Sequence, residues 1–309
     1  MDIFLQQLIN GLVLGSVYAL VALGYTMVYG ILELINFAHG EITMMGAMVA
    51  LAVIGALALA APGLPGVLVL GAGLAVAIPV CVALGLLIER VAYRPLRHAP
   101  RLAPLITAIG VSIILQNIAM LVWGKQYISF PAILPQGRHE VLGAHITDVQ
   151  IAILLLTMSI MLMLILVVQK TRLGRAMRAT AQSRQVASLM GVDVNRVIAS
   201  TFVIGSALAA VAGVMVSAYY GLAHYYMGFL LGLKAFSAAV LGGIGNLGGA
   251  MLGGLLLGLI ESFGAGYIGD LTGGFLGSHY QDVFAFFVLI AVLVFRPQGL
   301  LGARVVERA

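Results

Sequence analysis

The chain has 309 residues, of which 62% are hydrophobic and only 9% are charged, with a formal net charge of +5. Soluble domains carry about 25% charged residues and about half apolar ones, so this composition excludes a soluble globular enzyme. It also excludes a disordered chain, because disordered segments are polar and charged. The single cysteine, Cys81, excludes a disulfide framework and a cysteine-rich metal site.

Apolar segments long enough to cross a membrane recur along the chain. A helix that spans a bilayer needs about 20 apolar residues. Eight such segments are predicted at about 3–31, 42–61, 66–88, 102–123, 149–169, 197–220, 248–268 and 282–295, with a shorter ninth at 226–241. The first has no basic region before it and is expected to be retained rather than cleaved. The sequence therefore predicts an all-α polytopic membrane protein of about eight or nine transmembrane helices, with residues 1–309 forming one transmembrane domain.

The basic residues predict which segments face the cytoplasm, because Lys and Arg in short loops are retained there. They are Arg90, Arg94, Arg97 and Arg101; then Lys170, Arg172, Arg175, Arg178, Arg184 and Arg196; then Arg296, Arg304 and Arg308. The C-terminus is therefore expected inside, and stretches 124–150 and 269–281 outside. The spans alternate if 226–241 crosses, which puts the N-terminus outside. Residues 33–41 contain no Lys or Arg, so a re-entrant first element would reverse that last assignment.

Glycines spaced by four predict close helix packing. The sets Gly11/Gly15, Gly245/Gly249/Gly253 and Gly254/Gly258 would each lie along one helix face. The denser run 242–249 is expected to break a helix, either as a tight inner turn between two spans or as paired half-helices near a transport pathway. No glycine-lysine pair precedes Ser or Thr as a phosphate-binding loop requires. If ATP drives this chain, another subunit hydrolyses it.

The loop at 170–196 is the longest predicted inner loop, and it favours a short amphipathic helix over Arg175–Met190 that ends at Gly191. A polar stripe of Arg175, Arg178, Gln182 and Gln185 lies beside an apolar patch of Val186, Leu189 and Met190. Two interpretations stay open. Either the helix lies on lipid headgroups, or it docks into a groove of a cytoplasmic partner.

Several strings carry a resemblance to a known family. They are Asn10-Gly11-x-x-x-Gly15-Ser16, Gly24-Tyr25-Thr26-Met27-Val28-Tyr29-Gly30, Asn36-Phe37-Ala38-His39-Gly40-Glu41, Glu89-Arg90-Val91-Ala92-Tyr93-Arg94-Pro95, Ala187-Ser188-Leu189-Met190-Gly191, Lys234-Ala235-Phe236 and Pro297-x-Gly299. Over nearly its whole length, the chain resembles the LivH-type permease subunits of branched-chain amino acid ABC importers. In that family the loop containing residues 181–191 corresponds to the coupling helix that contacts the ATPase.

The resemblance also implies an assembly. It consists of this H-type permease, a second permease of the M type, two ATPases that bind ATP and Mg²⁺, and a periplasmic binding protein that delivers leucine, isoleucine or valine. It implies the bacterial inner membrane, with lipid but no nucleic acid as a partner, and no cofactor bound by this chain. Related permeases handle urea, short amides or other amino acids, which are the alternative substrates.

Asn36, His39 and Glu41 are polar residues between two apolar segments, where ionisable groups are costly. On a helix, Asn36 and His39 would share one face and Glu41 would turn away, so no metal site is predicted. Either these residues form a hydrogen-bonded cap or turn, or Asn36 and His39 line the translocation path with Tyr18, Tyr25 and Thr26. The tyrosines are equally candidates for interhelical hydrogen bonds.

Glu261 and Asn117 are the remaining path candidates, each inside a predicted span. Glu261 is either a structural partner, for example of Lys234, or the proton site of a secondary transporter. No nucleophile elbow, His-Glu-x-x-His motif or paired intramembrane aspartates occur, so no catalytic residue is predicted. We expect a passive helical gate moved by ATPases, without a deep, high-affinity pocket.

Overall fold

The computed structural model describes residues 2–97, 99–100, 102–131, 133, 137–272 and 280–302. Its helices are α1 (Asp2–Leu32), α2 (His39–Ala60), α3 (Gly66–Ile88), the π-helical turn η1 (Glu89–Tyr93), α4 (Leu102–Trp123), α5 (Asp148–Lys170), α6 (Arg172–Gln182), α7 (Arg184–Leu189), α8 (Val194–Tyr220), α9 (Met227–Gly242), α10 (Leu247–Leu271) and α11 (Gln281–Phe295). The basic residues Arg101, Arg304 and Arg308, and residues 273–279 of the predicted outer stretch, lie outside the described residues.

The predicted polytopic helical fold is confirmed. Within the described ranges, seven helices are long and apolar enough to cross a membrane, and two more apolar helices are shorter. The short ones are α9 and α11, with 16 and 15 residues. At 1.5 Å per residue each is about 24 Å long or less, below the roughly 30 Å of a hydrocarbon core. The segment at 282–295, expected as a full span, is therefore one of the two short helices.

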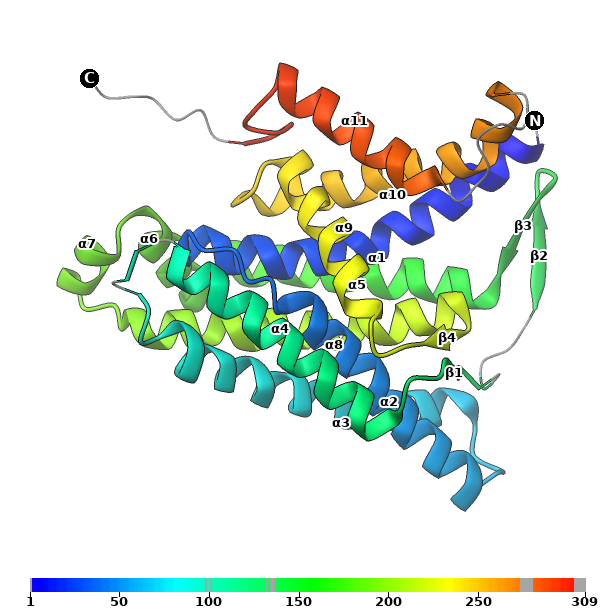
Figure 1. The fold of residues 1–309 in the computed structure, drawn as a ribbon, viewed down its shortest axis with the longest axis horizontal. Coiled ribbons are helices and arrows are strands. Elements are labelled where there is room, and N and C mark those ends of the chain that lie inside the picture. Colours follow the sequence, from blue (N-terminus) through cyan, green and yellow to red (C-terminus); the bar gives the residue numbers. More distant parts are fainter. Residues whose placement is uncertain are drawn as a thin grey trace.

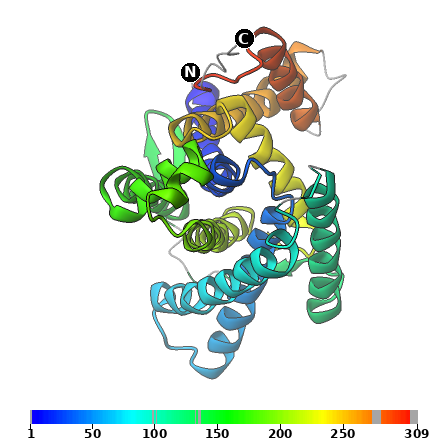
Figure 2. The same ribbon diagram turned by 90° about the vertical axis from the view of Figure 1, so that its left-hand side faces the viewer.

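The core is built around α1. From Gly11 to Leu32 nearly every residue of this helix is buried, and the helix packs against α10, α8 and α9. Figure 2 views the bundle from the end that carries α6 and α7 and shows α8 between α1 and α3. By contrast α3, α4 and α5 expose most of their apolar surface. A helix that is apolar all round but exposed on one side is what a lipid-facing position requires.

Glycines let α1 and α10 touch backbone to backbone, as their spacing predicted. A Cβ atom on Gly15 would lie 2.8 Å from the Leu255 backbone, and one on Gly258 would lie 2.2 Å from the Gly15 nitrogen. The set Gly245/Gly249/Gly253 does not share one helix face, because α10 begins at Leu247 and Gly245 lies in the preceding turn with φ +93°. That turn, not a pair of half-helices, is what the run 242–249 forms.

We expect Gly258→Ala to destabilise the fold, because the new methyl group would meet backbone that cannot rotate away. Overpacking of this kind costs about 1–3 kcal/mol. The matched control is Gly110→Ala on α4, where an added Cβ meets nothing within 4 Å among the described residues. The control should be neutral or slightly stabilising. Thermal unfolding in one detergent measures both, and equal midpoints would contradict the packing argument.

The two ends of the molecule differ, as Figure 1 shows. One end carries two short antiparallel pairs: β1 (Ile128–Ser129) with β4 (Leu222–Ala223), and β2 (Arg138–Val141) with β3 (Ala144–Thr147). The start of α1 lies at this end, because the Gln6 side chain forms two hydrogen bonds with the His145 backbone, at 3.0 and 2.8 Å. The opposite end carries α6, α7 and the turn between α9 and α10.

Candidate functional site

The loop predicted as one helix over 175–190 forms two helices. Thr171 caps α6 by accepting a hydrogen bond from the Gly174 nitrogen, and Ser183 caps α7 by accepting one from the Val186 nitrogen. Ser183 itself is extended, with φ −163°. A serine side chain competes for backbone amides and so favours a helix start over a helix interior. The prediction of one continuous helix is therefore wrong at Ser183, whereas Gly191 has the positive φ of +81° expected after a helix end.

All eight residues predicted to contact a partner are exposed, on α6, on α7 or directly after α7. They are Arg175, Arg178, Gln182, Gln185, Val186, Leu189, Met190 and Gly191. Leu189 is the most exposed of the three apolar side chains, at 86%. We call Val186, Leu189 and Met190 the α7 patch. Large apolar side chains gathered on a protruding element are typical of an interaction surface.

Arg184 fastens α7 to the end of the central helix. Its Nε donates to the Ile31 carbonyl at 3.1 Å and its Nη2 to the Leu32 carbonyl at 2.7 Å. These are among the last carbonyls of α1, which have no partner inside the helix. A guanidinium there is also favoured by the negative end of the helix dipole. A displacement of α7 therefore acts directly on the end of α1.

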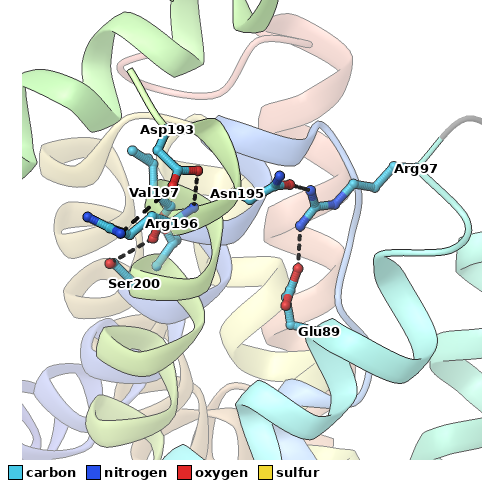
Figure 3. Close-up of polar contacts among 8 residues, drawn as sticks. Glu89, Arg97, Asp193, Asn195, Arg196, Val197 and Ser200 are labelled. Carbon is cyan, nitrogen blue, oxygen red and sulfur yellow. Dashed lines mark hydrogen bonds and ion pairs between the residues drawn. The ribbon is translucent and has the colours of Figure 1, made fainter. Parts of the chain in front are cut away.

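A second attachment joins η1 to the start of α8 (Figure 3). The Arg97 guanidinium pairs with the Glu89 carboxylate and also donates to the Asn195 side-chain oxygen at 2.5 Å. The Arg97 and Glu89 side chains are both nearly buried. Nearby, Asp193 caps α8 by accepting a hydrogen bond from the Arg196 nitrogen at 3.1 Å. The α6–α7 loop is thus held to the bundle at Arg184, in its middle, and at Asn195, near its end.

The chain re-enters the bundle after α1. Glu33 has a left-handed φ of +54°, and residues 33–38 are not helical. At the start of α2, the His39 ring lies so close to Gly24 that a Cβ there would be 2.1 Å from His39 Nε2. Gly24 is eight residues before the end of α1, or about 12 Å along the helix. Helix α2 therefore starts inside the bundle, where only protein or water can satisfy a non-helical backbone.

Polar side chains around this start are buried and incompletely paired. Asn36 Oδ1 accepts a hydrogen bond from the Tyr93 hydroxyl at 3.1 Å, and Tyr25 packs edge-on against His39 with centroids 4.9 Å apart. Four buried atoms here have no hydrogen-bond partner among the described residues: Thr26 Oγ1, Asn36 Nδ2, His39 Nε2 and Glu41 Oε2. Because such groups are normally paired, a cluster of them calls for a functional explanation.

Asn36 does not cap α2, because the cap position is Ala38 and no side chain caps it. The alternative of a hydrogen-bonded turn agrees with the structure, since the His39 nitrogen donates to the Asn36 carbonyl at 3.0 Å. Asn36 instead ties the re-entrant segment to η1. Glu41 does turn away from His39, towards α4, where Ser112 donates to its Oε1 at 3.0 Å and Gln116 at 2.7 Å.

A second polar cluster links four helices. Lys234 on α9 lies 2.6 Å from Glu261 Oε1 on α10 and 2.8 Å from Asp282 on α11. The Tyr18 hydroxyl on α1 donates to Glu261 Oε2 at 3.0 Å. Among the alternatives for Glu261, the structure shows the partner of Lys234, and it shows Tyr18 as an interhelical hydrogen-bond former.

Residues 7–293 match the family described as branched-chain amino acid transport system / permease component. The chain is 51% identical to the high-affinity branched-chain amino acid transport system permease protein BraD of Pseudomonas aeruginosa, covering 99% of this chain and 98% of the relative. It is 47% identical to the LivH permease of that system from Escherichia coli (strain K12), covering 99% and 97%.

The chain belongs to this permease family.

Two weaker similarities extend the comparison. A probable LivH of Methanocaldococcus jannaschii is 29% identical over 97% of the permease, and the autoinducer 2 import system permease LsrC of Photorhabdus laumondii is 33% identical over 42%. No solved structure matches. The permease is a membrane-embedded transport component.

The structure does not bring every path candidate together. Tyr25, Asn36 and His39 meet at the start of α2, whereas Tyr18 and Glu261 meet at the second cluster. Asn117 is exposed on α4 and bonds its own helix through the Ile113 carbonyl at 2.8 Å. Its neighbour Gln116 reaches Glu41 instead, a contact that the apolar pattern of the segment does not reveal.

Proposed function

We propose that the permease translocates branched-chain amino acids delivered by a periplasmic binding protein. It pairs with a second permease of the M type in the bacterial inner membrane. Two ATPases, which bind ATP and Mg²⁺, drive it. The high identity to the BraD and LivH permeases supports this substrate class over urea or amides.

The observation that carries the mechanism is the exposed α7 patch, which Arg184 fastens to the last carbonyls of α1. An ATPase docked on α6 and α7 would move α7 when its dimer closes. Arg184 would then transmit that motion to α1 and to the re-entrant segment 33–38. In this mechanism the chain forms the translocation path and transmits the motion through α7 and α1, and the ATPases supply the energy.

The same mechanism implies which end of the molecule faces the cytoplasm. The α6–α7 end, where the basic loop 170–196 lies, would face the cytoplasm, as positive loops do. The C-terminus would be cytoplasmic too. The start of α1 lies at the opposite end, beside β3, and would be periplasmic.

A proton-driven transporter is not favoured. Its proton site would be Glu261, but that carboxylate is held by Lys234 at 2.6 Å and by the Tyr18 hydroxyl at 3.0 Å. Both oxygens of this carboxylate therefore already have a partner within the bundle.

Reconstitution tests the proposal. The permease is expressed with its companion permease and ATPase subunits, purified by a tag on the permease, and placed in vesicles. We expect both partners to co-purify and labelled leucine to enter only with ATP and leucine-loaded binding protein. Uptake by the permease alone under a pH gradient, or a stable assembly without an ATPase, would contradict the proposal.

A further inference from the structure

A cavity lies at the end of the bundle that carries the two strand pairs (Figure 1). Its volume is about 490 Å³. Small-molecule sites typically measure roughly 300–1,000 Å³. Its lining includes Arg138 on β2, Val149 and Gln150 in the first turn of α5, and Ala218, Tyr219 and Tyr220 in the last turn of α8. Three segments that are far apart in the chain therefore border one space of the size that a small molecule needs.

Arg138 brings a positive charge without a partner to this cavity. It is the only charged residue among the described residues that line the cavity, and its guanidinium has no hydrogen bond or ion pair with any other described residue. The neighbouring Asp148 carboxylate is occupied, because it accepts from the Gly137 nitrogen at 2.9 Å and pairs with His139 at 2.7 Å. A guanidinium presents N–H donors in a fork that matches a carboxylate. The cavity is therefore receptive to a carboxylate.

Part of the cavity wall is aromatic and aliphatic. Tyr219 and Tyr220 pack edge to face with ring centroids 5.1 Å apart. Val149 and Ala218 add aliphatic surface to the same wall. Apolar and aromatic side chains with a few polar groups are what small-molecule sites present. An aliphatic side chain would therefore find apolar contacts in the same cavity as the guanidinium.

The cavity adjoins the central helix of the bundle. Gln150 donates to the Asn10 side-chain oxygen on α1 at 3.3 Å. Tyr220 lies within hydrogen-bonding reach of Tyr18, which is eight residues further along α1 and donates to Glu261 in the second polar cluster. Eight residues of helix measure about 12 Å. The lining residues therefore follow α1 from near its start towards the interior of the bundle.

We propose that this cavity is the outer entry site of the translocation path and holds an aliphatic amino acid by its carboxylate. Arg138 donates hydrogen bonds to the carboxylate, and the aliphatic side chain lies against Tyr219 and Val149. The inference rests on the proposed function and adds to it a binding residue on the periplasmic side. Tyr220 stands between the cavity and Tyr18, so an amino acid occupies this site before it passes into the bundle.

Ligand binding to the whole importer tests the site. Saturation-transfer NMR on the detergent-solubilised assembly without binding protein measures the affinities of leucine, 4-methylpentanoate (no ammonium) and 3-methylbutylamine (no carboxylate). Arg138→Gln keeps a hydrogen-bond donor but removes the charge. A hydrogen bond between charged partners changes affinity by about tenfold or more. Leucine and 4-methylpentanoate should each weaken about tenfold, whereas the affinity for 3-methylbutylamine should not change.

Lys125→Gln is the matched control for charge. It removes a positive charge at the same end of the bundle, where the Lys125 carbonyl contacts His224, but Lys125 does not line the cavity. It should leave all three affinities within about threefold. Ala218→Phe tests the space itself, because the larger side chain fills the cavity without changing any charge. It should weaken leucine and 4-methylpentanoate as Arg138→Gln does.

Two results would overturn the entry site. One is that Arg138→Gln leaves the affinities for leucine and 4-methylpentanoate unchanged, or weakens 3-methylbutylamine by the same factor. The other is that Arg138→Gln weakens only the association with the binding protein, because Arg138 would then pair with an acidic side chain of that protein. ATP-dependent leucine uptake by the unchanged importer, measured in parallel, tests the proposed function separately.

Discussion

Replacing Leu189 by glutamate is expected to abolish leucine uptake by detaching the ATPase. Leu189 is 86% exposed at the centre of the α7 patch and makes little contact within the permease. Truncating a central apolar contact of an interface typically costs 2 kcal/mol or more, about 30-fold in affinity, and a buried unpaired charge costs more. The measurement is the amount of ATPase that co-purifies with the tagged permease, followed by uptake in vesicles.

The matched control is Leu142→Glu, because Leu142 is equally exposed at 86% but lies in the turn between β2 and β3 at the opposite end. It should keep the full amount of ATPase. Arg184→Ala should give a third combination of ATPase binding and leucine uptake. It removes the hydrogen bonds between α7 and α1 but leaves the α7 patch in place. The ATPase should stay bound while leucine uptake per ATP hydrolysed falls. Full ATPase retention by Leu189→Glu would show that α7 touches only lipid headgroups.

Replacing Lys234 by methionine is the second change with a large expected effect. Lys234 holds two carboxylates, Glu261 and Asp282, and its side chain is only 14% exposed. Methionine fills a similar volume but leaves the buried Glu261 carboxylate beside the partly exposed Asp282 carboxylate without a cation. Removing one partner of a buried pair costs about 3–5 kcal/mol. We expect the folded yield and the thermal midpoint of the permease to drop sharply.

The comparison variant is Glu261→Gln, which keeps a hydrogen-bond acceptor for Tyr18 and leaves Lys234 paired with Asp282. It should cost much less stability and leave uptake largely intact. Restoring neutrality with Lys234→Met and Glu261→Leu together should recover part of the loss. If Glu261→Gln abolishes uptake while the protein stays folded, Glu261 has a direct part in transport.

The helices were predictable because their cause lies in the local sequence. A run of about 20 apolar residues has few alternatives to a helix in lipid, whatever surrounds it. The sets Gly11/Gly15 and Gly254/Gly258 likewise predicted close packing by their spacing, since small residues at intervals of four share one helix face. The end of α9 at Gly242 was predictable from the glycine-rich run, because glycine tolerates the positive φ of +106° at Gly243.

The polar contacts were less predictable. The sequence allowed several partners for Glu261, and Lys234 was one of them. The sequence did not predict Asp282 as the second partner of Lys234. Ser112 and Gln116 carry no signal that they reach Glu41, some seventy positions away in the chain. Ser183 differs, because serine is known to favour helix caps and its role could have been predicted. The good helix formers around it led instead to the prediction of one continuous helix.

The sequence alone determined that this is a polytopic helical permease with a basic, partly apolar loop on one side, since these properties follow from composition, periodicity and family strings. Only the tertiary structure decided that α2 begins about 12 Å inside the bundle, against Gly24. It also decided that Arg184 holds the end of α1. Both depend on contacts between residues far apart in the chain, and hydrophobic periodicity carries no information about which polar groups meet across helices.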